Sequence, residues 1–230
     1  MRGSLILAIL LVLTTVGADA QDDSGITANL TLTSDYVFRG ISQSGGDAAL
    51  QSGVYYSHPS GLAAGLWAST LDPGDDEVDT EIDYLLEYTH AFGEHWAASV
   101  GVTQYTYPGM SVEPDPNYRE LLLSGHYDDW LSATVGYSDD VFGAGRKGVS
   151  YEINSRFAAP KSLEVSAGLG LYDLSDAYAS KYSFYTLGLS RSFGMLTVGL
   201  AYHRTGGDAV ELFGAELSGG RTQLYLSADF

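Results

Sequence analysis

The feature that most constrains the fold is an alternation of apolar and polar residues along almost the whole chain. Within residues 26–39, Ile26 and Leu30 fall on one face, whereas Thr27 and Thr31 fall on the other. Successive side chains of a β-strand point to opposite faces, so a period of two predicts strands with one apolar and one polar face. The pattern recurs in eleven further segments: 48–57, 62–68, 80–90, 94–107, 118–127, 131–137, 149–157, 163–171, 182–192, 196–202 and 224–230.

The connections between these segments alternate in length. The short ones are 58–61, 92–95, 128–129, 159–161 and 192–194, and the long ones are 40–47, 72–79, 108–117, 138–147, 173–181 and 205–220. Tight turns at one end and longer loops at the other are typical of outer-membrane barrels, whose short turns are periplasmic. We therefore predict an all-β, antiparallel up-and-down transmembrane β-barrel of about twelve strands in the outer membrane of a Gram-negative bacterium, with both termini in the periplasm.

A soluble β-sandwich is the alternative fold, because it also has short alternating strands joined by regular turns. The segments 26–39, 80–90 and 94–107 are eleven to fourteen residues long, whereas globular strands average about five or six. Tilted membrane strands have lengths in this longer range. The chain also ends on a strand at Phe230, and a terminal aromatic residue resembles the signal that the barrel-assembly machinery reads. We therefore favour the membrane barrel, with outer-membrane lipid and this machinery as partners.

Residues 1–20 are predicted to be a cleaved secretory signal peptide that precedes one barrel domain, residues 21–230. Arg2 is followed by a largely apolar run, and Ala18 and Ala20 are the small residues expected before a cleavage site at Gln21. The apolar run is shorter than the ~20 residues that a membrane-spanning helix needs. The chain has 29 acidic and 11 basic residues, a balance that argues against a nucleic-acid partner.

Aromatic residues near the ends of the predicted strands suggest interfacial girdles. Tyr36 and Phe38 are placed on the apolar face at the outer end of the first strand, and Tyr137 is placed at the outer end of the seventh. Trp96 and Phe157 fall near periplasmic ends. Rings at both membrane surfaces are typical of outer-membrane barrels. A platform on which sugars stack is the alternative role for these rings.

The polar faces of the strands are predicted to line the lumen. By the phase of the alternation, the charged pore-lining residues are Asp35, Arg39, Glu81, Asp83, Glu87, Glu120, Glu152, Arg156, Glu164 and Arg221. Seven acids against three bases would repel anions and favour neutral or cationic polar solutes. The acidic run at 72–79 would add negative potential at the outer mouth. Alternatively, inward charges pair across the lumen and fill it, and we expect Asp35 and Arg39 to be near neighbours on one strand face.

We expect no enzymatic activity, no cofactor and no bound metal. Ser124 and His126 share one face, but it points into the lumen, whereas a lipid hydrolase of the outer membrane needs these groups facing lipid. The five histidines show no metal-ligand spacing, and the chain contains no cysteine. The acidic run at 72–79 lacks the pattern of an EF-hand, so a solvated loop explains it better than a Ca²⁺ site.

Two motifs resemble those of a known family. Residues 34–44, Ser-Asp-Tyr-Val-Phe-Arg-Gly-Ile-Ser-Gln-Ser, are similar to the N-terminal signature of the TorF family, a proteobacterial family also called Gcw_chp. Residues 105–109, Tyr-Thr-Tyr-Pro-Gly, followed by Glu120, resemble its second motif. The resemblance covers the chain from about residue 25 to the end. It implies an outer-membrane barrel with a porin function and no settled substrate.

The expected function follows from the size of such a barrel. Twelve strands about 4.8 Å apart and tilted by about 40° close a ring roughly 24 Å across, which leaves a narrow pore or a lumen filled by side chains. We expect a porin through which small neutral or cationic polar solutes diffuse passively. A closed structural barrel whose outer loops serve in adhesion is the alternative.

Overall fold

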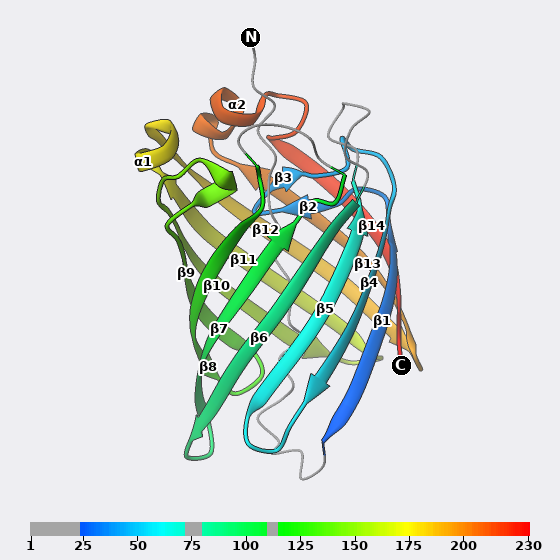
Figure 1. The fold of residues 1–230 in the computed structure, drawn as a ribbon. Coiled ribbons are helices and arrows are strands. Elements are labelled where there is room, and N and C mark those ends of the chain that lie inside the picture. Colours follow the sequence, from blue (N-terminus) through cyan, green and yellow to red (C-terminus); the bar gives the residue numbers. More distant parts are fainter. Residues whose placement is uncertain (1–23, 72–79, 110–114) are drawn as a thin grey trace.

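The computed structural model describes residues 24–71, 80–109 and 115–230, and these form one closed antiparallel barrel (Figure 1). Each barrel strand pairs with its neighbours in chain order, and the first strand closes the barrel against the last. The barrel strands are β1 (Gly25–Thr33), β4 (Ala49–Ser57), β5 (Leu62–Thr70), β6 (Thr80–Phe92), β7 (Trp96–Thr106), β8 (Tyr118–Tyr127), β9 (Leu131–Ser138), β10 (Gly148–Ala159), β11 (Leu163–Leu174), β12 (Ser180–Phe193), β13 (Leu196–Thr205) and β14 (Gly220–Asp229). The predicted fold class is therefore confirmed.

The two ends of the barrel differ, as the lengths of the connections predict. Short turns join β4 to β5, β6 to β7, β8 to β9, β10 to β11 and β12 to β13 at one end, where the C-terminus also lies (Figure 1). The opposite end, called here the loop end, carries the helices η1 (Val141–Gly143), α1 (Ser175–Tyr178) and α2 (Gly207–Phe213). The long loop predicted at 173–181 was wrong, because β11 and β12 extend further and leave only 175–179 between them.

Two predictions fall on parts of the chain that the structure does not describe. The signal peptide at 1–20 and the acidic run at 72–79 both lie outside the described residues. They therefore remain predictions.

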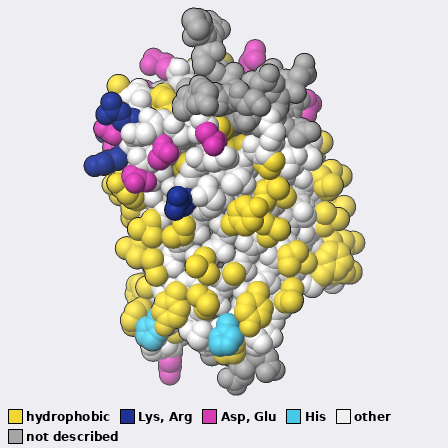
Figure 2. Space-filling view, viewed as in Figure 1, with side chains coloured by type: hydrophobic (Ala, Val, Ile, Leu, Met, Phe, Trp, Pro, Cys, Tyr) yellow, Lys and Arg dark blue, Asp and Glu magenta, His cyan; other side chains and the backbone are white. Residues whose placement is uncertain are grey.

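The outer wall of the barrel is apolar. Large hydrophobic side chains point outward along every barrel strand, including Leu86, which is 54 % exposed, and Leu30, which is 45 % exposed. In the face seen in Figure 2, hydrophobic side chains cover the wall, and acidic and basic side chains gather at the loop end. Trp96, Tyr137 and Phe157 are exposed on this outer surface. An apolar outer band with aromatic residues near its edges is the surface that lipid requires of a barrel.

No helix within the described ranges is long and apolar enough to span a membrane.

Candidate functional site

The connection between β1 and β4, residues 34–48, folds into the barrel instead of projecting from it (Figure 1). We call it the inner hairpin, because its short strands β2 (Val37–Phe38) and β3 (Ile41–Ser42) pair with each other. The prediction that Tyr36 and Phe38 belong to the outer girdle was wrong. The strand β1 ends at Thr33, and the two rings are only 3 % and 0 % exposed inside the barrel.

Polar contacts within the inner hairpin fix its shape. The Oγ of Ser42 donates to Oδ1 of Asp35 at 2.6 Å, and the Oγ of Ser44 accepts a hydrogen bond from the backbone N–H of Tyr36 at 2.9 Å. The tip requires glycine at residue 40, where φ is +79°. A Cβ on Gly40 would also lie 2.5 Å from Cγ2 of Thr205 on β13, so the tip packs directly on the barrel wall.

Arg39, at the tip of the inner hairpin, is held by two carboxylates on the barrel wall. Its Nη1 and Nη2 donate to the two oxygens of Glu120 on β8, both at 2.9 Å, and its Nε donates to Oε1 of Glu152 on β10 at 2.9 Å. The guanidinium also lies 4.7 Å from the ring centroid of Phe38 and 4.5 Å from that of Tyr172. All three nitrogens of the planar guanidinium donate to carboxylate oxygens, an arrangement that the single ammonium group of lysine would not reproduce.

The electrostatics keep Arg39 charged. Burial by itself would lower the pKa of the guanidinium, but the attraction of Glu120 and Glu152 outweighs burial and raises the pKa well above its ordinary value. The ion pair therefore persists at any pH at which the carboxylates are ionised.

A second ion pair anchors the base of the inner hairpin. Oδ2 of Asp35 accepts a hydrogen bond from Nη1 of Arg221 on β14 at 2.7 Å. The expectation that Asp35 and Arg39 are neighbours on one strand face was wrong, because the chain leaves the barrel wall after Thr33 and the two residues bind opposite parts of it. The two pairs tether the hairpin at both its base and its tip.

The two motifs identified in the sequence meet at this place. Glu120, which binds Arg39, also accepts a hydrogen bond from the hydroxyl of Tyr105 at 3.2 Å. The hydroxyl of Tyr36 lies 3.4 Å from Oε2 of Glu81, and Tyr107 hydrogen-bonds the same carboxylate. Burial, reinforced by Glu81 and Asp83, raises the pKa of Tyr36 well above its ordinary value, so its hydroxyl keeps its proton and acts as a donor.

Aromatic side chains complete a packed layer across the barrel at the level of the inner hairpin. Tyr36 packs edge-on against Trp67 at 5.6 Å between centroids, and Tyr105 stacks on Tyr118 at 4.6 Å. The buried rings of this layer are Tyr36, Phe38, Trp67, Tyr105, Tyr107, Tyr118, Phe142, Tyr172, Tyr182, Phe184 and Phe213. The alternation placed Tyr105 on the inward face, whereas Trp67, Tyr172 and Phe184 are functional candidates that the sequence analysis missed. The alternation along their strands places these three residues on the inward face, and this was the signal by which they could have been found.

The predicted lining residues divide into two groups. Asp35, Arg39, Glu81, Asp83, Glu120 and Glu152 are buried in the packed layer, and Arg221 borders it. The remaining three, Glu87, Arg156 and Glu164, lie nearer the short-turn end and are partly exposed. Solvent therefore contacts these three side chains.

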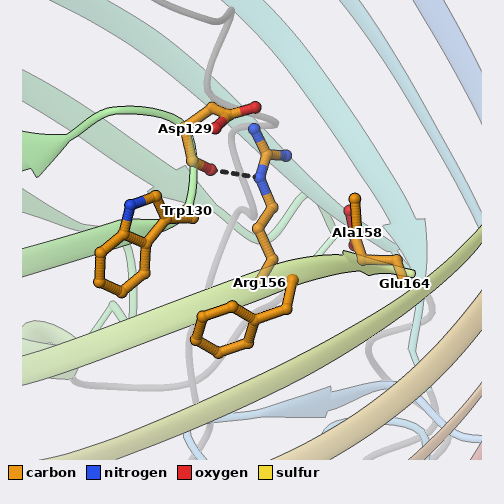
Figure 3. A pocket seen from close by; sticks show the side chains of 6 residues that line it. Asp129, Trp130, Arg156, Ala158 and Glu164 are labelled. Carbon is orange, nitrogen blue, oxygen red and sulfur yellow. Dashed lines mark hydrogen bonds between the residues drawn. The ribbon is translucent and has the colours of Figure 1, made fainter. Parts of the chain in front are cut away.

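A cavity of about 480 Å³ lies near the short-turn end (Figure 3). Its lining consists of Asp129, Trp130, Arg156, Phe157, Ala158 and Glu164. Nε of Arg156 donates to the backbone carbonyl of Asp129 at 2.5 Å, the bond drawn in Figure 3. This cavity lies at the rim of the barrel, and two of the predicted pore-lining residues, Glu164 and Arg156, are part of its lining.

Ser124 and His126 both face the lumen, as predicted, and do not bond each other. The Oγ of Ser124 lies 2.9 Å from Oγ1 of Thr134, and Nε2 of His126 lies 3.2 Å from Oγ of Ser99. Across the described residues, no group of three or more His, Cys, Asp or Glu side chains is arranged to hold a metal ion.

The fold and this interior define a class of protein, the outer-membrane type of transmembrane β-barrel with an internal loop. Solved structures similar in fold include a KdgM porin in complex with disordered oligogalacturonate, with a TM-score of 0.57 and 11% identity over 90% of this chain and 99% of that one. A structure from work on the in-meso crystallization of membrane proteins matches with a TM-score of 0.53 and 11% identity, covering 89% of this chain and 83% of the other. Pseudomonas aeruginosa OccK9 (OpdG) matches with a TM-score of 0.43 and 16% identity, covering 80% of this chain and 55% of that one.

The sequence itself matches a family model over residues 17–224. The chain belongs to that family, described as a bacterial protein of unknown function (Gcw_chp). The family suggested by the two motifs is confirmed under this name, and the name TorF remains a resemblance. No curated protein matches the sequence.

Proposed function

We propose that the chain is a porin-type channel for small neutral or cationic polar solutes, and that the inner hairpin limits its conductance. The observation that carries the proposal is a polar, acid-rich lumen occupied by the inner hairpin, which ion pairs and other non-covalent contacts hold against the barrel wall. A barrel of this size is wide enough for a small aqueous path once such a segment moves.

The charge of the interior supports the choice of solute. The packed layer contains the carboxylates of Asp35, Glu81, Asp83, Glu120 and Glu152, against the guanidinium of Arg39 within the layer and that of Arg221 at its border. The KdgM porin structure is a complex with oligogalacturonate, a sugar chain that carries carboxylates. An acid-rich interior repels such a ligand, so the shared fold does not imply a shared solute.

Location and orientation are part of the same proposal. The outer surface is suited to lipid, and we place the barrel in the outer membrane of a Gram-negative bacterium with the short turns and both termini in the periplasm. The C-terminal Phe230 is paired with β1, since its backbone N–H donates to the carbonyl of Ala28 at 2.9 Å. This end of the chain is the segment that we expect the barrel-assembly machinery to recognise.

A closed structural barrel is the second candidate, and the packed layer is the observation that favours it. Phe38, Ile41, Glu120 and Tyr172 are each 0 % exposed, so bulk solvent does not contact these side chains around the tip of the inner hairpin. The two candidates differ in whether the hairpin leaves its site in the membrane.

Ion selectivity tests the proposed solute class. The measurement is the reversal potential across a salt gradient in a planar bilayer, for the full chain and for a hairpin-free variant in which Gly-Ser-Gly-Ser replaces residues 36–43. We expect cation preference, and we expect it to decrease when Glu87 and Glu164 in the open part of the lumen become glutamine, because they lower the energy of a cation on the path. Glu94→Gln, on an exposed turn, is the control. Anion preference, or no effect of the double variant, would contradict the proposed lining.

A further inference from the structure

Glu81 and Asp83 are buried acids for which the described residues provide no cation. They lie two residues apart on the inward face of β6, and both are 0 % exposed. Oε1 of Glu81 and both Oδ atoms of Asp83 have no hydrogen-bond partner. Buried carboxylate oxygens are almost always paired, because their desolvation is otherwise uncompensated.

The other acids of the packed layer do not share this situation. Glu120 and Glu152 bind Arg39, and Asp35 binds Arg221. The local deficit of positive charge is therefore confined to the pair on β6. Its three unpartnered oxygens are all acceptors when the carboxyls are ionised, so they require donors from outside the described side chains.

Aromatic rings surround this pair of acids. In the register of the sheet, Asp83 is paired with Trp67 on β5 and with Tyr105 on β7. Tyr36 of the inner hairpin contacts both Trp67 and Glu81. Aromatic faces attract cations, and they attract organic ammonium groups in particular.

We propose that Glu81 and Asp83 form a binding site for a small primary ammonium cation inside the barrel. A primary ammonium has three N–H donors, which matches the three unpartnered oxygens, and the rings add cation–π attraction. A calcium ion takes six to eight oxygen ligands, so an aromatic wall suits it poorly. The site deepens the proposed function and rests on it, because a solute reaches it only along the lumen. Tyr36 then couples the bound cation to the position of the inner hairpin.

Thermal unfolding of the refolded full chain in detergent tests the site without any need for conduction. The probes are methylammonium, potassium, tetramethylammonium and magnesium chlorides at matched ionic strength, and the readout is the temperature at which the folded band is lost on a gel. We expect methylammonium to raise this temperature by a few degrees in a saturable way, because a ligand that binds only the folded state stabilises it. Tetramethylammonium, which has no N–H donor, should have little effect.

The variants Glu81→Gln and Asp83→Asn, singly and combined, are expected to abolish the response to methylammonium. Glu94→Gln on an exposed turn should retain it. If the double variant does not fold, calorimetric titration of the wild type with methylammonium replaces it. Saturable binding would support the site, and no binding would overturn it. Equal stabilisation by all the salts, or an undiminished response in the variants, overturns the site. Binding without conduction would retain the site and refute the channel, whereas conduction without binding would do the reverse.

Discussion

Arg39→Ala is expected to lower the free energy of unfolding by about 3–5 kcal/mol, the cost of removing one partner from a buried ion pair. The substitution leaves the carboxylates of Glu120 and Glu152 buried without their cation. We expect the tip of the inner hairpin to leave its site and water to enter, so conductance in a planar bilayer should exceed that of the wild type. Chemical unfolding in detergent gives the stability.

Two variants control this experiment. Arg39→Lys keeps the charge but loses the two-pronged contact, so it should restore part of the stability. Arg191→Ala removes an exposed arginine that lies over Phe193 on the outer face, and it should change neither quantity appreciably. If Arg39→Ala were as stable as the wild type and conducted no more, Arg39 would not be what holds the hairpin.

Gly40→Ala is expected to displace the inner hairpin by a different route. An alanine here would have φ near +79°, which costs about 1–2 kcal/mol for a residue other than glycine. Its Cβ would also approach Cγ2 of Thr205 to 2.5 Å and Cβ of Phe184 to 3.0 Å, which adds roughly 1–3 kcal/mol of overpacking. We expect conductance to rise, because the hairpin relieves the overlap by moving away from β12 and β13.

Gly93→Ala separates these two contributions. Gly93 has φ of +76°, almost the same as Gly40, but a Cβ there would meet nothing within 4 Å, and the residue lies in a turn at the opposite end of the barrel. The Gly93→Ala variant should lose only the stability that corresponds to the cost of a positive φ, and its conductance should equal that of the wild type. Equal conductance in the two alanine variants would show that the tip of the hairpin does not limit the current.

The wall of the barrel was largely predictable from the sequence, because the period of two follows directly from the geometry of a strand. Outward residues such as Leu86 and inward ones such as Glu87 are placed as the alternation requires. The lengths of the connections likewise separated the two ends of the barrel. These features are local, and each can be read within one strand or one turn.

The inner hairpin was not predictable by the same method. Tyr36 and Phe38 keep the phase of the apolar residues of β1, although Ser34 interrupts that face, so a period of two cannot distinguish a longer strand from a loop folded inward. The contacts that draw the hairpin inward are distant in sequence. Arg39 binds Glu120, which lies 81 positions further along the chain, and Glu152, which lies 113 positions further along. Gly40 was a local signal, since glycine after a polar residue is typical of a turn.

The two sequence motifs acquire a common explanation in the structure. Arg39 of the first motif and Tyr105 of the second both bind Glu120. The residues that carry the family resemblance therefore serve to seat the inner hairpin in the barrel. The lining residues in the open part of the lumen belong to neither motif.

The most direct test of the account is the single-channel conductance of the wild type and of the hairpin-free variant, both shown to be folded, in the same planar bilayer. If the inner hairpin limits the current, the wild type will show small or infrequent steps and the variant will show large, lasting ones. Equal conductance in the two proteins would contradict the account, and so would a hairpin-free barrel that carries no current.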